Sequence, residues 1–333
     1  MTEPMAGATP VEADWDQAPR LLEGARSLTL TVGQCDLAYW FSAVAQGTHR
    51  GRPLGTSGAL VTPEYMREPG PLREALRLEL AYRALDEEAA VRLLSYYVAT
   101  APGIPELEFF STQLMDEARH HMIFRNHLVN LGMPAEGLMD WIRATGAEYS
   151  KQILKPIWDF TVGVVVDEAD FIGAVITFAI ILEGVLAAAV ELSERKWGVL
   201  DPVAGEIARG AAIDEIRHLT VGSSIVREHL ISHPESRSKM MALLHRGRDL
   251  WTQLSDREFV MHRERLFQQG MEKHRDLLQD YELFPGHRML DTTPEDRWDL
   301  AAKWNDELAV SRLEYMGLPE AIELLRAKAA RIL

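Results

Sequence analysis

Hydrophobic residues along this chain recur mostly at helical spacing, and patterns typical of strands are scarce. The clearest case begins at Pro71 and runs to about Thr100, where an Ala-Pro-Gly sequence interrupts the pattern. The apolar residues of this segment follow one another at intervals of three, four or seven positions: Leu76, Leu80, Ala84, Val91, Leu94 and Val98. This spacing predicts one long helix with a single apolar face.

The same pattern predicts helices over most of the remaining chain. We expect residues 1–14 to be disordered and the Gly/Pro-rich stretch 47–71 to be a loop. The other segments expected to be helical cover about 15–46, 105–131, 136–160, 165–196, 202–232 and 236–281, then a helix after Thr293 and a short one from Pro319. No linker rich in Gly and Ser divides the chain, so we expect one all-α domain over 15–333. Its core would lie at about 72–232, and a helical extension at about 236–333.

Composition and charge narrow the classes of partner. The 333 residues include 50 acidic and 35 basic side chains, a net charge of -15, which disfavours nucleic acids and anionic membranes. The single cysteine, Cys35, excludes an internal disulfide and any metal site built on several thiolates. The N-terminus lacks the features of a signal peptide. We therefore expect a cytoplasmic protein, and any metal site must use carboxylates and imidazoles.

One apolar run, residues 171–190, is long enough to cross a membrane. It carries a single charge, Glu183, near its middle, and no cluster of Lys or Arg flanks it. A helix that is apolar on all sides is also typical of the centre of a soluble bundle. We favour this second interpretation and expect no membrane span.

Two pentapeptides share the pattern Asp-Glu-x-Arg-His. They are residues 116–120 and 214–218. On a helix, a Glu and a His three positions apart lie on the same side, so both can bind one metal ion. A lone Glu-x-x-His is common by chance, but two copies that also share the flanking Asp and Arg are a specific signal.

Each copy has an acidic candidate about thirty residues upstream, on the preceding predicted helix. Glu183 precedes Glu215 by 32 residues, and Glu87 precedes Glu117 by 30. Both upstream residues fall among apolar neighbours, where an unpaired charge is costly. Glu88 competes with Glu87 as the first candidate, although the apolar stripe favours Glu87.

Four helices would thus direct Glu, Glu-x-x-His, Glu and Glu-x-x-His inward, which is the arrangement of ferritin-like di-iron and di-manganese proteins. Four carboxylates and two imidazoles suit two iron ions, with manganese as the alternative. A metal-bound His usually donates its second ring N–H to a carboxylate. We expect Asp116 to hold His218 and Asp214 to hold His120, with the two flanking arginines, Arg119 and Arg217, neutralising these aspartates.

These motifs resemble those of the di-iron carboxylate oxygenases and oxidases, over about residues 72–232. The superfamily includes the ribonucleotide reductase small subunit, the multicomponent monooxygenases, the acyl-carrier-protein desaturases and the arylamine N-oxygenases. The resemblance implies a ferritin-like four-helix bundle and dioxygen as a co-substrate. The metal ligands that it implies are Glu87, Glu117, His120, Glu183, Glu215 and His218.

Three departures narrow the resemblance. Phe124 stands where the radical-bearing reductase subunit has Tyr, Ala187 where hydrocarbon monooxygenases have Thr, and Ala211 where arylamine N-oxygenases have an additional His. The match that remains is to the small N-oxygenase-like enzymes of bacterial natural-product pathways, including the valanimycin type that oxidises hydrazines toward azoxy groups. This implies N-oxygenation of a small metabolite. The alternatives are C–H hydroxylation or desaturation within the superfamily, and an iron-storage or structural bundle.

Partners and the remaining polar residues complete the expectations. The sequence has no flavin or dinucleotide fingerprint, so electrons must come from an external ferredoxin or reductase. By analogy we expect a homodimer. We expect His121 to point away from the metal and Trp40 to be a core or interface residue. Residues interpreted as surface charges or solvated histidines are Glu74, Glu79, Asp86, His127, His245, His262 and His274.

Overall fold

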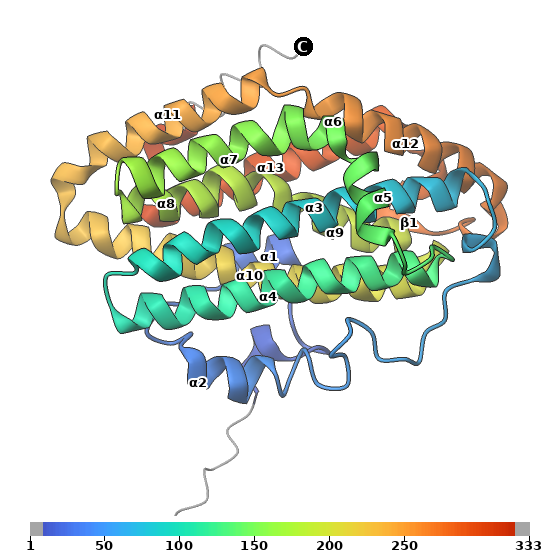
Figure 1. Ribbon diagram of the computed structural model, residues 1–333, viewed down its shortest axis with the longest axis horizontal. Helices are drawn as coiled ribbons and strands as arrows, with labels where there is room; N and C mark the ends of the chain where they lie inside the picture. The colour runs from blue at the N-terminus through green and yellow to red at the C-terminus, as the bar shows by residue number, and fades with distance from the viewer. Residues whose placement is uncertain (1–8, 324–333) are drawn as a thin grey trace, which may run out of the picture.

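The computed structural model describes residues 9–323, and this part of the chain is almost entirely helical (Figure 1). Its strands form one small antiparallel hairpin, β1 (Glu282–Phe284) with β2 (His287–Arg288). The predicted all-α class is therefore confirmed.

Long helices that pack in pairs form the centre of the molecule. α3 (Pro71–Thr100) packs along α4 (Ile104–Asn130), and α9 (Glu183–Leu200) packs along α10 (Pro202–Ser232). The bounds of α3, α4 and α10 match the predicted segments to within a residue or two. Proline occupies the first turn of each of these three helices, where its missing N–H is not needed.

The apolar run contains a break that the sequence did not reveal. Instead of one regular helix over 165–196, the chain forms α8 (Phe171–Ile176), a π-helical turn (Thr177–Leu182) and then α9. By length and composition, Phe171–Leu200 is the one described helix that could cross a membrane, but 78% of its most apolar window is buried inside the protein. This burial supports the bundle-centre interpretation.

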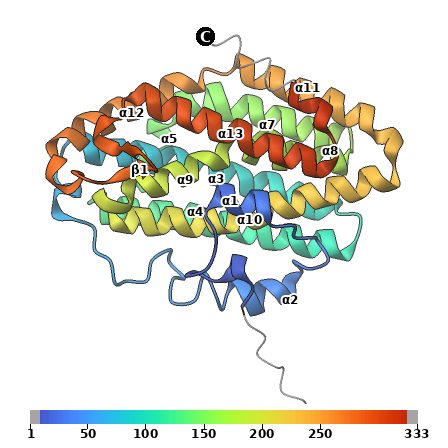
Figure 2. The ribbon, with the colours of Figure 1, turned by 180° about the vertical axis from the view of Figure 1, so that it is seen from behind.

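Further helices lie beside the central pairs (Figures 1 and 2). The segment predicted at 136–160 contains α5 (Leu138–Thr145), α6 (Ala147–Tyr149) and α7 (Lys155–Val162), with a π-helical turn between α6 and α7. The helix predicted after Thr293 is α13 (Pro294–Met316), and Thr293 and Asp296 form a capping box at its start.

The prediction of a single helix over 236–281 is wrong. Two helices occupy this segment, α11 (Arg237–Gln253) and α12 (Asp256–Lys273), and the β1–β2 hairpin follows. Leu254 adopts an extended conformation, which ends α11, and the acidic residues Asp256 and Glu258 favour a new helix N-terminus. α12 then packs on α3, and α13 packs on α9 and α10.

The N-terminal segment is less helical than predicted. Residues 1–8 of the expected disordered stretch lie outside the described residues, but Val11–Ala13 form a 3-10 turn in which Ala13 is buried. Between residues 15 and 46, α1 (Leu21–Ser27) and α2 (Leu37–Tyr39) are separated by a loop rich in β-branched residues, and a π-helical turn (Trp40–Val44) follows α2. The prediction of one helical region is therefore wrong. α2 lies beside α4 (Figure 1).

Two apolar clusters fill the centre of the molecule at different levels along the long helices. On α3 the cluster that contains Leu76 and Ala84 ends before residue 87, and most of the second cluster on this helix begins at Leu93. The same change of cluster occurs on α4, between Phe110 and Ile123. The change from one cluster to the other occurs again near residue 183 at the start of α9 and near residues 215–221 on α10. The bundle therefore encloses a polar layer between two apolar ones.

Candidate metal centre

The structure brings all six predicted ligands together in this polar layer. They form two groups of side chains, and within each group the potential ligand atoms lie within 4.8 Å of one another. The first group is Glu117, Glu183, Glu215 and His218, and the second is Glu87, Glu117 and His120. Glu117 belongs to both groups. Glu117 is therefore the one side chain of the six that could contact an ion at either group.

Each imidazole turns its Nδ1 atom toward the carboxylates. His120 Nδ1 lies 3.0 Å from Glu117 Oε2 and 3.8 Å from Glu87 Oε1. His218 Nδ1 lies 3.2 Å from Glu117 Oε1 and 3.6 Å from both Glu183 Oε1 and Glu215 Oε2. Nδ1 is therefore the atom of each histidine that can bind a metal here.

The opposite ring nitrogens contact the two aspartates across the bundle, as the sequence predicts. His218 Nε2 lies 3.2 Å from Asp116 Oδ2, and His120 Nε2 lies 3.1 Å from Asp214 Oδ2. Donation from Nε2 to a carboxylate leaves the lone pair on Nδ1, which is the tautomer that a metal requires. The crossed pairing also ties α4 to α10 at the level of the site.

The two arginines of the motifs lie against these aspartates. Arg217 contacts Asp116 and also lies 3.5 Å from Asp214 Oδ1. Arg119 Nη1 lies 3.5 Å from Asp214 Oδ2. The expected neutralisation is therefore present, although Arg217 serves both aspartates.

Glu87 and Glu88 point in different directions. Glu87 belongs to the cluster, and its side chain is 15% exposed. Glu88 Oε1 accepts a hydrogen bond from Arg92 Nη2 at 2.8 Å on the outer side of α3. The geometry favours Glu87 as the candidate ligand.

Three further residues that sequence reasoning missed contact this centre. Trp40 Nε1 donates to Asp116 Oδ1 at 2.9 Å, His49 Nε2 lies 3.2 Å from Asp214 Oδ2, and Gln113 contacts Glu183. Trp40 and His49 belong to the N-terminal segment, where no periodic pattern relates them to the motifs. Gln113 precedes Glu117 by one helical turn, so helical spacing is a signal that relates it, alone of the three, to the motifs.

His49, Asp116 and Asp214 also lie close enough to form a metal-binding group of their own. Arg217 and Arg119 contact the two aspartates, however, and their positive charges already compensate the carboxylates. A cation is therefore disfavoured at this position. We interpret these residues as the support of the histidine ligands.

Burial and crowding of like charges perturb the carboxylates. Burial, followed by the charge of Glu215, raises the pKa of Glu183 to about 8. Burial and then the charge of Glu117 raise the pKa values of Glu87 and Glu215. Burial also acts to raise the pKa of Glu117, but the nearby imidazoles of His218 and His120 outweigh it, so this pKa is lowered. Four carboxylates this close together favour a positive charge among them.

Three atoms of the candidate ligands lack a hydrogen-bond partner. Glu183 Oε2, Glu215 Oε2 and His218 Nδ1 are buried and make no hydrogen bond. Such atoms are costly inside a protein unless something binds them. An octahedral dication accepts carboxylate oxygen and imidazole nitrogen, so this donor set fits iron or manganese. Thiolate-rich and all-oxygen sites do not match it.

Several polar residues outside the centre differ from their predicted roles. Glu79 is 3% exposed and lies near Lys196, so it is not a surface charge. Asp86 accepts a hydrogen bond from Tyr149 at 2.8 Å, and burial raises its pKa to about 7. His127 is fully buried against Asp201, at 3.0 Å, and is not solvated.

Four of these expectations hold, and two of them concern His245 and His262, which are exposed. His121 Nδ1 donates to the Ala84 carbonyl at 2.7 Å, away from the cluster, as predicted. Glu74 remains at the surface, where it pairs with Arg77.

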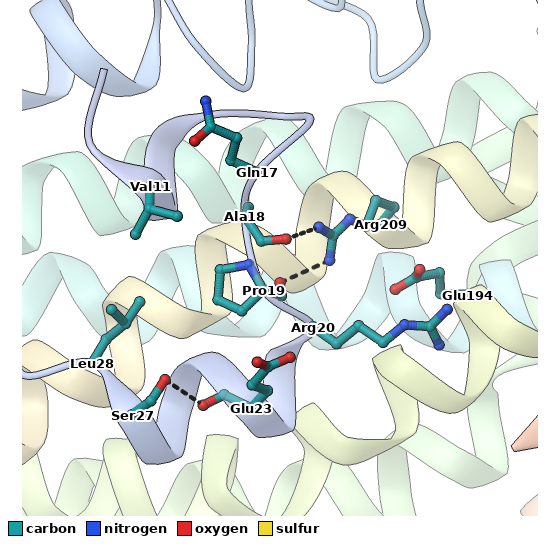
Figure 3. Close-up of a pocket in the computed structure, with 10 residues that line it drawn as sticks. All are labelled: Val11, Gln17, Ala18, Pro19, Arg20, Glu23, Ser27, Leu28, Glu194 and Arg209. Atoms are coloured by element: carbon teal, nitrogen blue, oxygen red, sulfur yellow. Dashed lines mark hydrogen bonds between the residues drawn. The ribbon is translucent and has the colours of Figure 1, made fainter. Parts of the chain in front are cut away.

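A cavity of about 640 Å³ opens elsewhere, between the N-terminal segment and helices α9 and α10 (Figure 3). It contains none of the six candidate ligands. Arg209 at its wall donates to the carbonyls of Ala18 and Pro19, so its guanidinium holds the N-terminal segment in place. We assign this cavity no part in the chemistry of the centre.

The three positions that depart from the resembling families are all buried. Phe124 stands near His120, with ring centroids 6.4 Å apart, and supplies no phenol oxygen. Ala187 and Ala211 supply neither a hydroxyl nor an additional imidazole.

No protein-family model matches the chain and no curated protein matches its sequence, so the functional assignment rests on the motifs and on this geometry.

Proposed function

We propose that this protein is a ferritin-like di-iron oxygenase that uses dioxygen to oxidise a small metabolite, with N-oxygenation of an amine or hydrazine as the reaction. In this proposal α3, α4, the α8–α9 segment and α10 form the four-helix core. The observation that carries the proposal is the convergence of two Asp-Glu-x-Arg-His motifs with two buried glutamates, including metal-facing atoms that have no hydrogen-bond partner.

Two iron ions bound by the six side chains would supply the redox chemistry by which dioxygen is activated. The protein contributes charge balance, because four carboxylates match the four positive charges of two ferrous ions. The crossed Asp116–His218 and Asp214–His120 pairs fix the imidazole rings and their tautomers. The apolar layers above and below keep the centre dry, which strengthens each of these interactions.

We infer the kind of substrate from the resemblance and from two positions that lack the side chains found in the related families. With Phe124 in place of a tyrosine, storage of a radical at that position is not supported. With Ala211, no seventh protein ligand stands before Glu215. A small nitrogenous metabolite, an external electron donor and a homodimeric state belong to the same proposal.

Metal analysis and a reaction assay test this function together. The purified wild type should hold about two iron ions per chain, and Glu183→Ala and His218→Ala should lose metal while retaining their helical circular dichroism. Glu88→Ala is the matched control, because Glu88 lies one position from a candidate ligand but faces Arg92. If all variants kept two ions, the assigned site would be wrong.

With a chemical reductant and dioxygen, amine or hydrazine substrates should yield N-oxygenated products. Formation of peroxide alone would contradict N-oxygenation. Products oxidised at carbon would support the alternative hydroxylase or desaturase. Uptake of hundreds of iron ions per chain would instead indicate storage.

A further inference from the structure

We propose that Gln113 is a positioning residue that fixes Glu183 and makes the two metal positions unequal. The inference rests on the proposed function, because it assumes that the six side chains bind metal. It concerns a residue outside the two motifs and outside the six ligands.

The contact between the two side chains is direct and buried. Gln113 Nε2 donates to Glu183 Oε1 at 2.7 Å, and Gln113 is 2% exposed. The other carboxylate oxygen, Glu183 Oε2, is buried and has no hydrogen-bond partner. The amide therefore holds Oε1, which also lies 3.6 Å from His218 Nδ1 in the cluster, and Oε2 remains without a partner.

The backbone at this point makes such support useful. Glu183 is the first residue of α9 and directly follows the π-helical turn Thr177–Leu182. Leu182, just before it, departs from regular helical geometry with φ -101° and ψ -76°. The ligand thus stands at an irregularity in the helix, and the hydrogen bond from α4 fixes the direction of its carboxylate.

The other half of the centre lacks this support. Gln113 lies four residues before Glu117, and the corresponding residue four positions before Glu215 is Ala211, which has no donor. Glu87, the counterpart of Glu183, is the more accessible of the two, with 15% side-chain exposure against 10%. The amide of Gln113 therefore holds Glu183, whereas Glu87 has no amide at the matching position.

Because Gln113 holds Glu183 and no matching amide holds Glu87, we expect the two metal ions to bind with unequal affinity. The ion between Glu117, Glu183, Glu215 and His218 should bind first and more tightly, and the ion beside Glu87 and His120 should bind second. Loss of a residue that orients a metal ligand typically weakens metal binding about 10- to 100-fold. Without Gln113, the first binding step should weaken by about this factor and approach the second.

The test is a titration of the metal-free full-length protein with Mn²⁺, in which electron paramagnetic resonance measures the free ion. Gln113→Met removes the donor at nearly constant volume, and Gln113→Glu replaces the donor by a second carboxylate. Asn126→Met is the matched control, because it removes an amide from the exposed face of the same helix. Helical circular dichroism verifies folding of each variant.

The expected result is two separated binding steps in the wild type and in Asn126→Met. In Gln113→Met the tighter step alone should weaken by about 10- to 100-fold. In a Glu183→Leu background, Gln113→Met should have no further effect, because the oxygen that accepts its hydrogen bond is already removed. This second comparison still tests the inference if a single variant is unstable.

Two outcomes would overturn the inference and are distinct from failure of the proposed function. If Gln113→Met bound both ions as the wild type does, Gln113 would have no positioning role. An equal effect of Gln113→Met with and without Glu183 would show that Gln113 acts elsewhere. A wild type that bound no pair of ions would instead refute the proposed function itself.

Discussion

Replacing Asp116 by asparagine removes a buried negative charge that faces three donors, one from the N-terminal segment and two from α10. Asp116 Oδ1 accepts from Trp40 at 2.9 Å, while Oδ2 contacts both Arg217 and His218. An asparagine offers one acceptor oxygen and an NH₂ group in place of the second. In one orientation this NH₂ group faces Arg217 and His218, and in the other it faces the indole N–H of Trp40. Either orientation brings donors against donors.

The effect on metal binding follows from the tautomer of His218. In either orientation His218 loses its carboxylate partner, and where NH₂ faces His218 Nε2, this nitrogen becomes the acceptor and the ring proton moves to Nδ1, the metal-facing atom. Loss of such a partner typically weakens metal binding about 10- to 100-fold, which is about 1.4–2.7 kcal/mol.

A second cost falls on the fold rather than on the metal. The Arg217 guanidinium is 2% exposed and would keep only the more distant Asp214 carboxylate, at 3.5 Å. Breaking a buried ion pair by removing one charge costs about 3–5 kcal/mol. The Asp116→Asn variant should therefore be less stable in urea as well as weaker in metal binding.

Competition with a chelator on folded protein separates these two effects from each other. Trp40→Phe is the control: it removes one neutral donor and leaves the carboxylate, so it should cost about 1 kcal/mol of stability with little change in metal affinity. The reasoning would be refuted if Asp116→Asn bound both ions with wild-type affinity. It would also fail if Trp40→Phe weakened metal binding as much as Asp116→Asn.

Four other outcomes are expected. Metal affinity should rise with pH up to about 8 and binding should release protons, because the raised pKa of Glu183 means that a proton must leave before the ion binds; pH-independent titrations would contradict this. In the metal-free protein the same shift has the opposite sign for stability: the contribution of Glu183 is fully present below its ordinary pKa near 4.5 and is lost as pH rises through about 8, which urea unfolding of Glu183→Gln against the wild type would show. Lys196→Met should destabilise the protein by about 3–5 kcal/mol, because it leaves Glu264 buried with Arg297 as its main partner, and urea midpoints would measure this. His49→Ala should weaken binding of the ion at His120 by about tenfold, because Asp214 loses a partner, and a wild-type titration curve would contradict that role.

The clustering of the six side chains could be predicted from the sequence because its signals are local. A Glu and a His three positions apart must share a helix face, and a duplicated motif identifies two such helices. Glu87 and Glu183 were identified because a charge on an apolar stripe needs a reason to be there. The crossed Asp–His pairs followed from the usual partners of metal-bound histidines, and the structure shows both.

Features that depend on contacts between distant segments were not predicted. Trp40 and His49 reach the aspartates from a loop whose path is fixed by tertiary packing. Glu79 and His127 resembled surface residues because their partners, Lys196 and Asp201, lie far away in the sequence. The π-helical turn before Glu183 left no sign in an unbroken apolar run, since apolar residues suit both kinds of helix.

The most direct test of the central claim is anomalous diffraction at the iron edge from crystals of the protein loaded with ferrous iron under anaerobic conditions. The account predicts two peaks about 3.5–4 Å apart, one beside His218 and Glu183 and the other beside His120 and Glu87, with Glu117 between them. A single peak, peaks outside these six side chains, or none at all would contradict it.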